Sequence, residues 1–233
     1  MTTYPMGDAQ VRLFMARSDG SFPMYVGSWA EVTTEAGPRM YRTLGHANGW
    51  GHVGGTVEDM LDRDLTGFSE VSPDTLEDAD PDAIRALQHQ LEQLALARRI
   101  ATEAHAGQTD KLGVEYIEHP RRVAARLDEF REQAVAWLHD VVEDTDVTED
   151  DLRTAGLDEE IVEAVLLLTR TEGDDHYYAR IAASPLARSV KLADIADNAD
   201  PERVAQLDED TRTRLAAKYR HARRALGAEE ETR

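Results

Sequence analysis

Apolar residues after residue 80 recur at the three- and four-residue spacing that is typical of amphipathic helices. The first run follows Asp80 and Pro81, which suit the N-cap and the first turn of a helix. Its apolar positions are Ile84, Leu87, Leu91 and Leu94. We expect this helix to reach Ala104 or His105 and to end at Gly107. Similar patterns predict helices over residues 120–130, 131–142, 148–154, 158–169, 177–183, 185–196 and 210–226.

Residues 1–80 have a different texture and hold many of the glycines, prolines and aromatic residues. Two short runs, 11–15 and 24–29, flank a turn at 18–21 and predict a β-hairpin. Residues 57–65 fit a short helix. The pattern therefore predicts a mainly α protein, with a small α+β element of unknown role in residues 1–80 and a helical domain in residues 81–228.

The bulk composition narrows the class of protein. The 233 residues are 41% hydrophobic and 31% charged, which is ordinary for a soluble globular protein. No apolar run approaches the roughly 20 residues that cross a bilayer, and the first residues do not resemble a signal peptide. The absence of cysteine excludes disulfides and thiolate metal sites. We therefore expect a cytoplasmic protein without a membrane partner.

The net charge of −20 argues against nucleic acid as a partner, because such binding draws mainly on Lys and Arg that neutralise phosphates. One interpretation of the acidic surplus is a heavily solvated surface. The other is attraction for divalent cations, which requires specific ligands. The sequence leaves open whether the chain forms a homo-oligomer.

Candidate ligands lie in a segment whose polar residues interrupt an apolar helix. On a continuous helix His139 would lie beside Glu143, and Asp140 beside Asp144. Their neighbours are apolar, and burial of an unpaired carboxylate is costly. A divalent cation that binds His139 and Asp140 would offset this cost. The alternative is a solvated helix edge, which the His-Asp dipeptide taken alone favours.

Two further segments strengthen the metal interpretation. His119 opens one predicted helix, and Asp194 lies in an apolar segment near the C-terminal end of another. Together with His139 and Asp140 they form a mixed nitrogen and oxygen donor set. Such a set suits Mn²⁺, Fe²⁺ or Zn²⁺ and leaves positions for water and substrate.

The order His…His-Asp…Asp resembles the HD superfamily of metal phosphohydrolases. Four segments (104–108, 113–120, 138–145 and 191–198) resemble the motifs of the RelA/SpoT-type hydrolase domain and of the small alarmone hydrolases. The likeness spans roughly residues 83–226, and nothing comparable covers residues 1–80. It implies an HD-domain helical bundle that follows the small N-terminal α+β element.

The resemblance also implies roles for individual residues. The metal ligands would be His119, His139, Asp140 and Asp194, with Mn²⁺ as the ion. Glu143 and Asp144 match the acidic pair that orients and deprotonates the attacking water. A bound divalent ion lowers the pKa of water from about 15.7 towards neutrality.

Substrate contacts are implied at Lys111, Lys191, Asn198 and Tyr219. Lys191 would contact a phosphate or pair with a carboxylate, and both alternatives stay open. For Asn198 the alternative is a helix-end hydrogen bond, and for Tyr219 it is packing. We expect His105 to make a structural hydrogen bond.

Three positions depart from the family pattern. Asp110 stands where a basic residue is usual, Ile195 follows Asp194, and Asp197 precedes Asn198 in place of histidine. The predicted function is hydrolysis of the 3′-pyrophosphate of ppGpp or pppGpp. Asp110 keeps open an HD phosphohydrolase that acts on another phosphorylated nucleotide or a dinucleotide cofactor. A non-catalytic nucleotide-sensing module is the third alternative, and the acidic pair argues against it.

Overall fold

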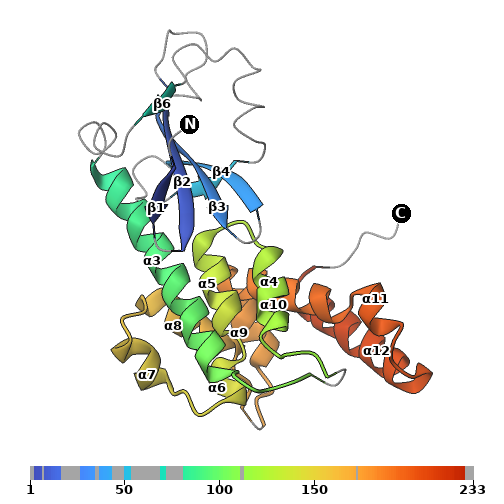
Figure 1. The fold of residues 1–233 in the computed structure, drawn as a ribbon. Coiled ribbons are helices and arrows are strands. Elements are labelled where there is room, and N and C mark those ends of the chain that lie inside the picture. The colour runs from blue at the N-terminus through green and yellow to red at the C-terminus, as the bar shows by residue number, and fades with distance from the viewer. Residues whose placement is uncertain are drawn as a thin grey trace. The chain divides into compact units, whose positions relative to one another are not determined.

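The computed structural model describes residues 3–6, 8–16, 27–34, 37–43, 50–53, 69–71, 81–110, 113–171 and 173–228 (Figure 1). The described chain is mainly helical, which confirms the predicted fold class. It divides into two compact units, Met1–Ala95 and Leu96–Arg233. The division of the chain into domains of residues 1–80 and 81–228 stays a prediction. Among the described residues, no helix combines the length and the apolar character needed to span a membrane.

The first unit is built on an antiparallel sheet. Its strands are β1 (Tyr4–Met6), β2 (Ala9–Ala16), β3 (Gly27–Thr34), β4 (Gly37–Thr43), β5 (Trp50–His52) and β6 (Ser69–Val71). They run in the order β1-β2-β3-β4-β5, and β6 also pairs with β2. The pairing of β2 with β3 bears out the two strands of the predicted hairpin. Strand β2 is longer than the predicted 11–15, whereas β3 shares only residues 27–29 with the predicted 24–29 and continues to Thr34. Residues 24–26 lie outside the described residues. The predicted turn at 18–21 and the predicted helix at 57–65 lie outside the described residues.

Both faces of this sheet carry buried side chains. Val11 pairs with Val32 on one face, and Phe14 pairs with Trp29 on the other; all four are at most 2% exposed. Burial on both faces replaces the apolar-polar alternation of a half-exposed strand by longer apolar stretches. This explains why β4 gave no clear pattern in the sequence, since its neighbours Met40 and Tyr41 are both buried.

The second unit is a helical bundle. Helix α3 (Pro81–Ala104) begins in the first unit and ends in the second. It is followed by α4 (Glu118–Ala125), α5 (Phe130–Leu138), α6 (Val141–Asp144), α7 (Glu149–Thr154), α8 (Glu159–Leu168), α9 (Tyr177–Ala183), α10 (Pro185–Asn198), α11 (Pro201–Val204) and α12 (Glu209–Ala225). Helix α5 packs against α4, α8 and α10 and is buried along nearly its whole length (Figure 1).

The predicted helix over 131–142 is interrupted at the polar motif. Helix α5 ends at Leu138, and α6 begins only at Val141. The Nδ1 atom of His139 bonds the Ala136 carbonyl at 2.7 Å, and Asp140 adopts φ −107° and ψ −5°, near the sparsely populated bridge region. On a continuous helix, neighbouring side chains point about 100° apart. The break lets His139 and Asp140 face the same point.

Short helix α11 was not predicted, although Asp200 and Pro201 repeat the Asp-Pro signal that marks the start of α3. The Asp200 side chain accepts the Glu202 amide N–H at 2.9 Å, as an N-cap does. The other predicted helices match the structure within about two residues at each end, apart from 120–130, which ends early at Ala125.

Helix α7 begins with a reciprocal capping box whose contribution can be measured. The Thr148 hydroxyl accepts the Asp151 amide N–H at 3.2 Å, and the Asp151 carboxylate accepts the Thr148 N–H at 2.9 Å. We expect Thr148→Ala to lower the free energy of unfolding by about 1 kcal/mol, because the Asp151 amide N–H loses the hydroxyl that accepts its hydrogen bond. Urea unfolding measures this loss. Thr148→Ser keeps the hydroxyl and should retain most of the stability; equal loss in both variants would contradict the capping role.

Candidate metal centre

Three helices bring the predicted metal ligands together. His119 lies in the first turn of α4, His139 and Asp140 lie between α5 and α6, and Asp194 lies in the second half of α10. Helix α10 packs against both α4 and α5, so these chain segments meet inside the bundle. Ligand atoms of His119, His139 and Asp140 all lie within 4.8 Å of one another.

Asp194 completes this arrangement. Its Oδ1 atom lies 3.3 Å from His119 Nε2 and 3.9 Å from His139 Nε2. Asp140 Oδ2 lies 3.7 Å from His119 Nε2 and 3.0 Å from His139 Nε2. Four residues from three helices thus point their donor atoms at one small volume. We call His119, His139, Asp140 and Asp194 the ligand quartet.

The chemistry of these donor atoms fits a divalent cation. His139 is 2% exposed, and its Nδ1 bonds the Ala136 carbonyl, which leaves Nε2 with its lone pair. This Nε2 makes no well-formed hydrogen bond, although Asp140 Oδ2 is only 3.0 Å away. A lone pair that faces carboxylate oxygens is repelled by them unless a proton or a cation lies between. Imidazole and carboxylate donors together suit a borderline divalent metal.

Protons take the place of the cation when none is bound. Burial alone would lower the pKa of His119, but hydrogen bonds with Asp194 and Asp197 raise it from 6.5 to about 9. Burial likewise opposes protonation of His139, and the charge of Asp140 outweighs it and raises the pKa. Despite burial, His139 holds the pKa of Asp140 well below its usual range, and Lys191 does the same for Asp194. Cation binding must therefore release protons.

Two predicted substrate-contact residues hold Asp194. Lys191 Nζ lies 2.8 Å from Asp194 Oδ2, and the Asn198 amide donates to Asp194 Oδ1. For Lys191 the structure has the carboxylate pair, one of the two predicted alternatives. Burial would lower the pKa of Lys191, but the Asp194 charge raises it well above its usual range, so the ion pair persists at neutral pH.

Tyr116 lies in the motif segment 113–120, where packing is the expected role of this tyrosine, and its hydroxyl contacts the centre. It donates to Asp140 Oδ2 at 2.6 Å and lies 3.1 Å from Asp144 Oδ2. Burial and the charges of these two carboxylates raise the pKa of Tyr116 far above its usual value, so the phenol keeps its proton. The expected structural hydrogen bond of His105 is present, from Nδ1 to Gln108 Oε1 at 2.9 Å.

Asp197, which the sequence marks only as a departure from the family pattern, is a second contributor to the centre. It is fully buried; its Oδ2 lies 2.9 Å from His119 Nδ1, and Arg122 donates to both of its oxygens. Burial would raise the pKa of Asp197, but the bonds from His119 and Arg122 lower it to about 2. Its position three residues after Asp194, on one helix face, is the signal that could have identified it.

The acidic pair lies at the exposed rim of this centre. Glu143 and Asp144 are exposed on α6, directly after Asp140. The Arg170 amide N–H donates to Glu143 Oε2 at 2.9 Å, and the Gln108 amide donates to the Asp144 carbonyl at 3.2 Å. One carboxylate oxygen of Glu143 is therefore fixed in direction while the side chain stays open to solvent.

Lys111 lies outside the described residues, so its predicted contact with substrate stays a prediction. The neighbouring Asp110 shapes the loop before α4: its Oδ1 accepts the Val114 amide N–H at 3.1 Å. Its Oδ2 lies 3.1 Å from an Arg203 guanidinium nitrogen on α11. The charge of Asp110 is thus balanced by an arginine that is 93 residues away in the chain.

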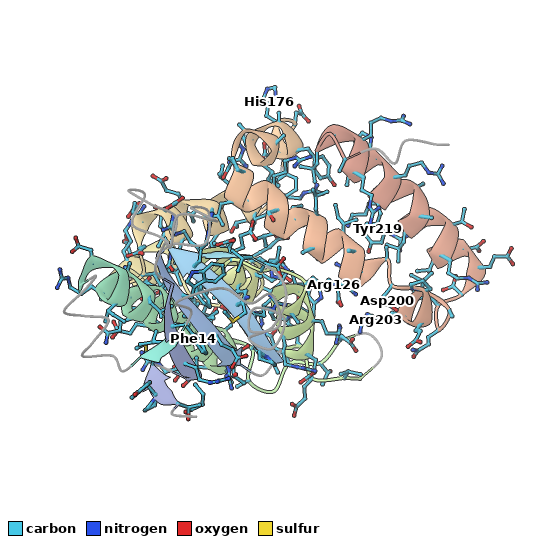
Figure 2. The ribbon with its side chains drawn as sticks, turned by 90° about the horizontal axis from the view of Figure 1, so that it is seen from above. Phe14, Arg126, His176, Asp200, Arg203 and Tyr219 are labelled. Carbon is cyan, nitrogen blue, oxygen red and sulfur yellow. The ribbon has the colours of Figure 1, made fainter. Side chains whose placement is uncertain are left out.

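Tyr219 and several cations surround the centre. Figure 2 shows Tyr219 on α12, with Arg126, Asp200 and Arg203 near the corner between α10 and α11. Burial and the charge of Asp194 raise the pKa of Tyr219. Burial and the nearby charges of Lys191 and Arg170 lower the pKa of Lys218. The Arg170 guanidinium lies 4.5 Å from the centre of the Tyr177 ring. The charge of Arg214 also acts on Lys218 and Tyr219, where it favours a lower pKa of both. We call Arg170, Lys191, Arg214 and Lys218 the cation cluster.

Comparison with known proteins gives partial sequence matches, and no family model matches the chain. The chain is 46% identical over 67 residues to a guanosine-3′,5′-bis(diphosphate) 3′-pyrophosphohydrolase of Vibrio cholerae, which is 27% of this chain and 10% of the relative. An enzyme of the same name from Aquifex aeolicus is 33% identical over 120 residues, 46% of this chain and 17% of the relative. The bifunctional (p)ppGpp synthase/hydrolase SpoT of Escherichia coli is 42% identical over 67 residues, again 27% and 10%.

The chain therefore spans less than a fifth of the length of these relatives. Among solved structures, a metazoan SpoT orthologue described as hydrolysing ppGpp is 22% identical, with a TM-score of 0.49. The likeness covers 57% of this chain and 85% of that chain. The similarity to the guanosine-3′,5′-bis(diphosphate) 3′-pyrophosphohydrolases therefore rests on the sequence matches and not on this structural likeness.

The linkage between protons and the cation can be tested by thermal unfolding. The raised pKa of His119 stabilises the metal-free fold below its unfolded pKa of 6.5, and this contribution is lost as the pH rises through about 9. Proton competition with a cation weakens over the same range. We expect the rise in Tm that saturating Mn²⁺ produces, relative to EDTA, to be larger at about pH 8.5 than at about pH 6.5 under nitrogen. An increment that does not change with pH would contradict the assigned histidines.

Proposed function

From the partial sequence likeness to guanosine-3′,5′-bis(diphosphate) 3′-pyrophosphohydrolases, we propose that the protein is a metal-dependent phosphohydrolase of the RelA/SpoT type that removes the 3′-pyrophosphate of ppGpp or pppGpp. The observation that carries the proposal is the convergence of the ligand quartet, from three helices, beside an exposed acidic pair. The names of the partial relatives support the same reaction and substrate.

The ligand quartet is the proposed holder of the cation. Mn²⁺ is the proposed ion, because the motifs resemble those of manganese enzymes and the donors are imidazole and carboxylate groups without any thiolate. When bound, a divalent cation lowers the pKa of water and neutralises charge on a phosphate. His119 and His139 are too deeply buried to serve as exposed surface ligands, which supports a specific centre rather than a diffuse acidic surface.

Glu143 is the proposed acceptor of the proton from the attacking water. The Arg170 amide N–H fixes one oxygen of this carboxylate, and its exposure gives water access. A positioned carboxylate within hydrogen-bond reach can act as a general base. Asp144 shares the Tyr116 hydroxyl with Asp140, which supports a role for Asp144 in aligning the water-binding side of the centre.

The cation cluster supports a substrate with several phosphate groups. The chain has 46 acidic residues, yet Arg170, Arg214 and Lys218 form no ion pair within the described part of the chain. Cations that lack a carboxylate partner in so acidic a protein create a local positive potential. Phosphoryl transfer depends mainly on positioning and charge neutralisation, so these side chains are proposed to hold phosphate groups next to the centre.

The ion pair between Asp110 and Arg203 lessens the objection that a carboxylate would repel polyphosphate at this position. Stacking of Tyr219 on the base and contacts from Lys111 and Asn198 remain part of the proposal. The proposed partner is a phosphorylated nucleotide and not nucleic acid, and the proposed location is the cytoplasm.

Substrate choice is tested by incubating the protein and Mn²⁺ with ppGpp, pppGpp, GTP and NADPH and following phosphate and pyrophosphate release. We expect pyrophosphate from ppGpp and pppGpp and no release from GTP, because only the first two carry a 3′-pyrophosphate. Hydrolysis of NADPH with ppGpp left intact would favour the dinucleotide alternative. Binding without turnover, seen as a rise in Tm, would favour the sensing module.

Two isosteric variants separate metal binding from proton transfer. Asp140→Asn should remove Mn²⁺ binding, whereas Glu143→Gln should keep it and lower kcat by about 10²- to 10⁴-fold, as loss of a general base does. The electron paramagnetic resonance signal of free Mn²⁺ measures binding. Glu163→Gln, an exposed carboxamide change on α8, is the matched control. If Glu143→Gln loses Mn²⁺ binding as fully as Asp140→Asn does, the role proposed for Glu143 is wrong.

Removal of one positive charge tests the cation cluster. We expect Lys218→Gln to raise KM for ppGpp roughly tenfold, in line with loss of a charge-assisted hydrogen bond, with a smaller effect on kcat. Arg212→Gln makes the same charge change on α12 outside the cluster and should leave KM within about twofold. If both variants raise KM equally, general attraction rather than a local contact explains the effect.

A further inference from the structure

The buried Asp197 carboxylate contacts residues of helix α4 and the arginine that directly follows it. Its side chain is only 1% exposed, and its Oδ2 lies 2.9 Å from His119 Nδ1. Arg122 forms a fork on it, with Nε donating to Oδ1 at 2.9 Å and Nη2 donating to Oδ2 at 3.1 Å. Arg126 Nη2 lies 3.8 Å from Oδ1. The carboxylate therefore joins the C-terminal part of α10 to one face of α4.

The sequence of α4 supplies this face. His119, Arg122 and Arg126 are three and four residues apart, so they lie along one side of the helix. A buried carboxylate is costly unless it is paired, and the Arg122 fork provides that pair. The fork alone would satisfy Asp197. The contact with His119 is additional, and it acts on the ring that carries a ligand atom.

The two histidines of the quartet are oriented in different ways. His139 Nδ1 bonds a neutral acceptor, the Ala136 carbonyl, at 2.7 Å. His119 Nδ1 instead faces a charged acceptor, which is held in turn by an arginine. A carboxylate that accepts the Nδ1–H of a ligand histidine fixes the tautomer and makes the other nitrogen a stronger donor.

We propose that Asp197 is a positioning residue for the metal centre: it accepts the Nδ1–H of His119 and so directs the Nε2 lone pair towards the cation, while Arg122 holds the carboxylate in place. This inference rests on the proposed metal centre. According to this inference, the aspartate that replaces the usual histidine at residue 197 contributes to the metal affinity of this chain.

Direct Mn²⁺ titration tests the inference without any need for turnover. Free Mn²⁺ is followed by electron paramagnetic resonance for the full chain and for Asp197→Asn. We expect Asp197→Asn to raise the Kd about 10- to 100-fold, the usual effect of losing an outer partner of a ligand histidine. The substituted side chain loses its charge, and its amide can donate to Nδ1 and favour the wrong tautomer of His119.

Two more variants make the result specific. Arg122→Gln leaves the carboxylate on His119 but removes its fork, so a smaller rise in Kd is expected. Asp200→Asn is the matched control: Asp200 lies 3.5 Å from Arg126 and caps α11, and Asn is an equally good cap. Its Kd should stay within about twofold of the unchanged protein, because the Asp200 side chain contacts Arg126 and the Glu202 amide rather than His119.

The outcomes are distinguishable. A residue that only packs would lower the free energy of unfolding of the metal-free protein and leave the Kd unchanged, and this result for Asp197→Asn overturns the inference. An equal rise in Kd for Asp200→Asn also overturns it, because general damage at the end of α10 would then explain both. If Asp197→Asn does not unfold cooperatively, Arg122→Gln decides, and an unchanged Kd overturns the inference. If the unchanged protein binds no Mn²⁺, the proposed metal centre itself fails.

Discussion

The neutralisation of two carboxylates, the buried Asp194 and the half-buried Asp140, is the constraint on which the helical unit depends. Asp140 and Asp194 both face His119 and His139 where α4, α5 and α10 meet. Both carboxylates are held in the charged form. Ionised carboxylates in a protein interior are tolerated only when cations or hydrogen-bond donors surround them. The packing of these three helices is therefore inseparable from the chemistry of the space between them. A purely apolar junction would pack more simply and would have no affinity for a metal.

The surrounding residues neutralise or bond these carboxylates, some directly and some through a further side chain. Lys191 and Asn198 hold Asp194 from its own helix, and the Tyr116 hydroxyl holds Asp140 from the loop before α4. Further out, Arg122 neutralises the carboxylate that orients His119. Each partner comes from a different turn or helix, so the centre is supported from several directions. Such support is what keeps donor atoms within the few tenths of an ångström that metal binding requires.

Local sequence patterns predicted most helices of the second unit, because apolar spacing and caps are short-range signals. The same signals could not predict the interruption at His139 and Asp140, which arises from a side-chain bond to a carbonyl and from the need to aim two neighbours at one point. Motif order predicted that the four residues of the ligand quartet lie close together, and the distances between their side chains agree; their role as metal ligands stays a proposal. The contacts of Asp197 with Arg122 and of Asp110 with Arg203 join residues 75 and 93 positions apart, and no local pattern encodes them. In the first unit, burial of neighbouring residues on both faces obscured the alternating pattern of β4.

The distribution of the ligand quartet along the chain has a mechanical consequence. His119 and Asp194 belong to segments that are 75 positions apart, and the chain has no cysteine with which to tie such segments together. An ion bound by both segments would cross-link them and close this long loop. By chain-entropy arguments such a cross-link raises the free energy of unfolding by roughly 4 kcal/mol. Removal of the metal would thus destabilise the helical bundle. The rate of proteolysis would then report the fraction of the protein that has an ion bound.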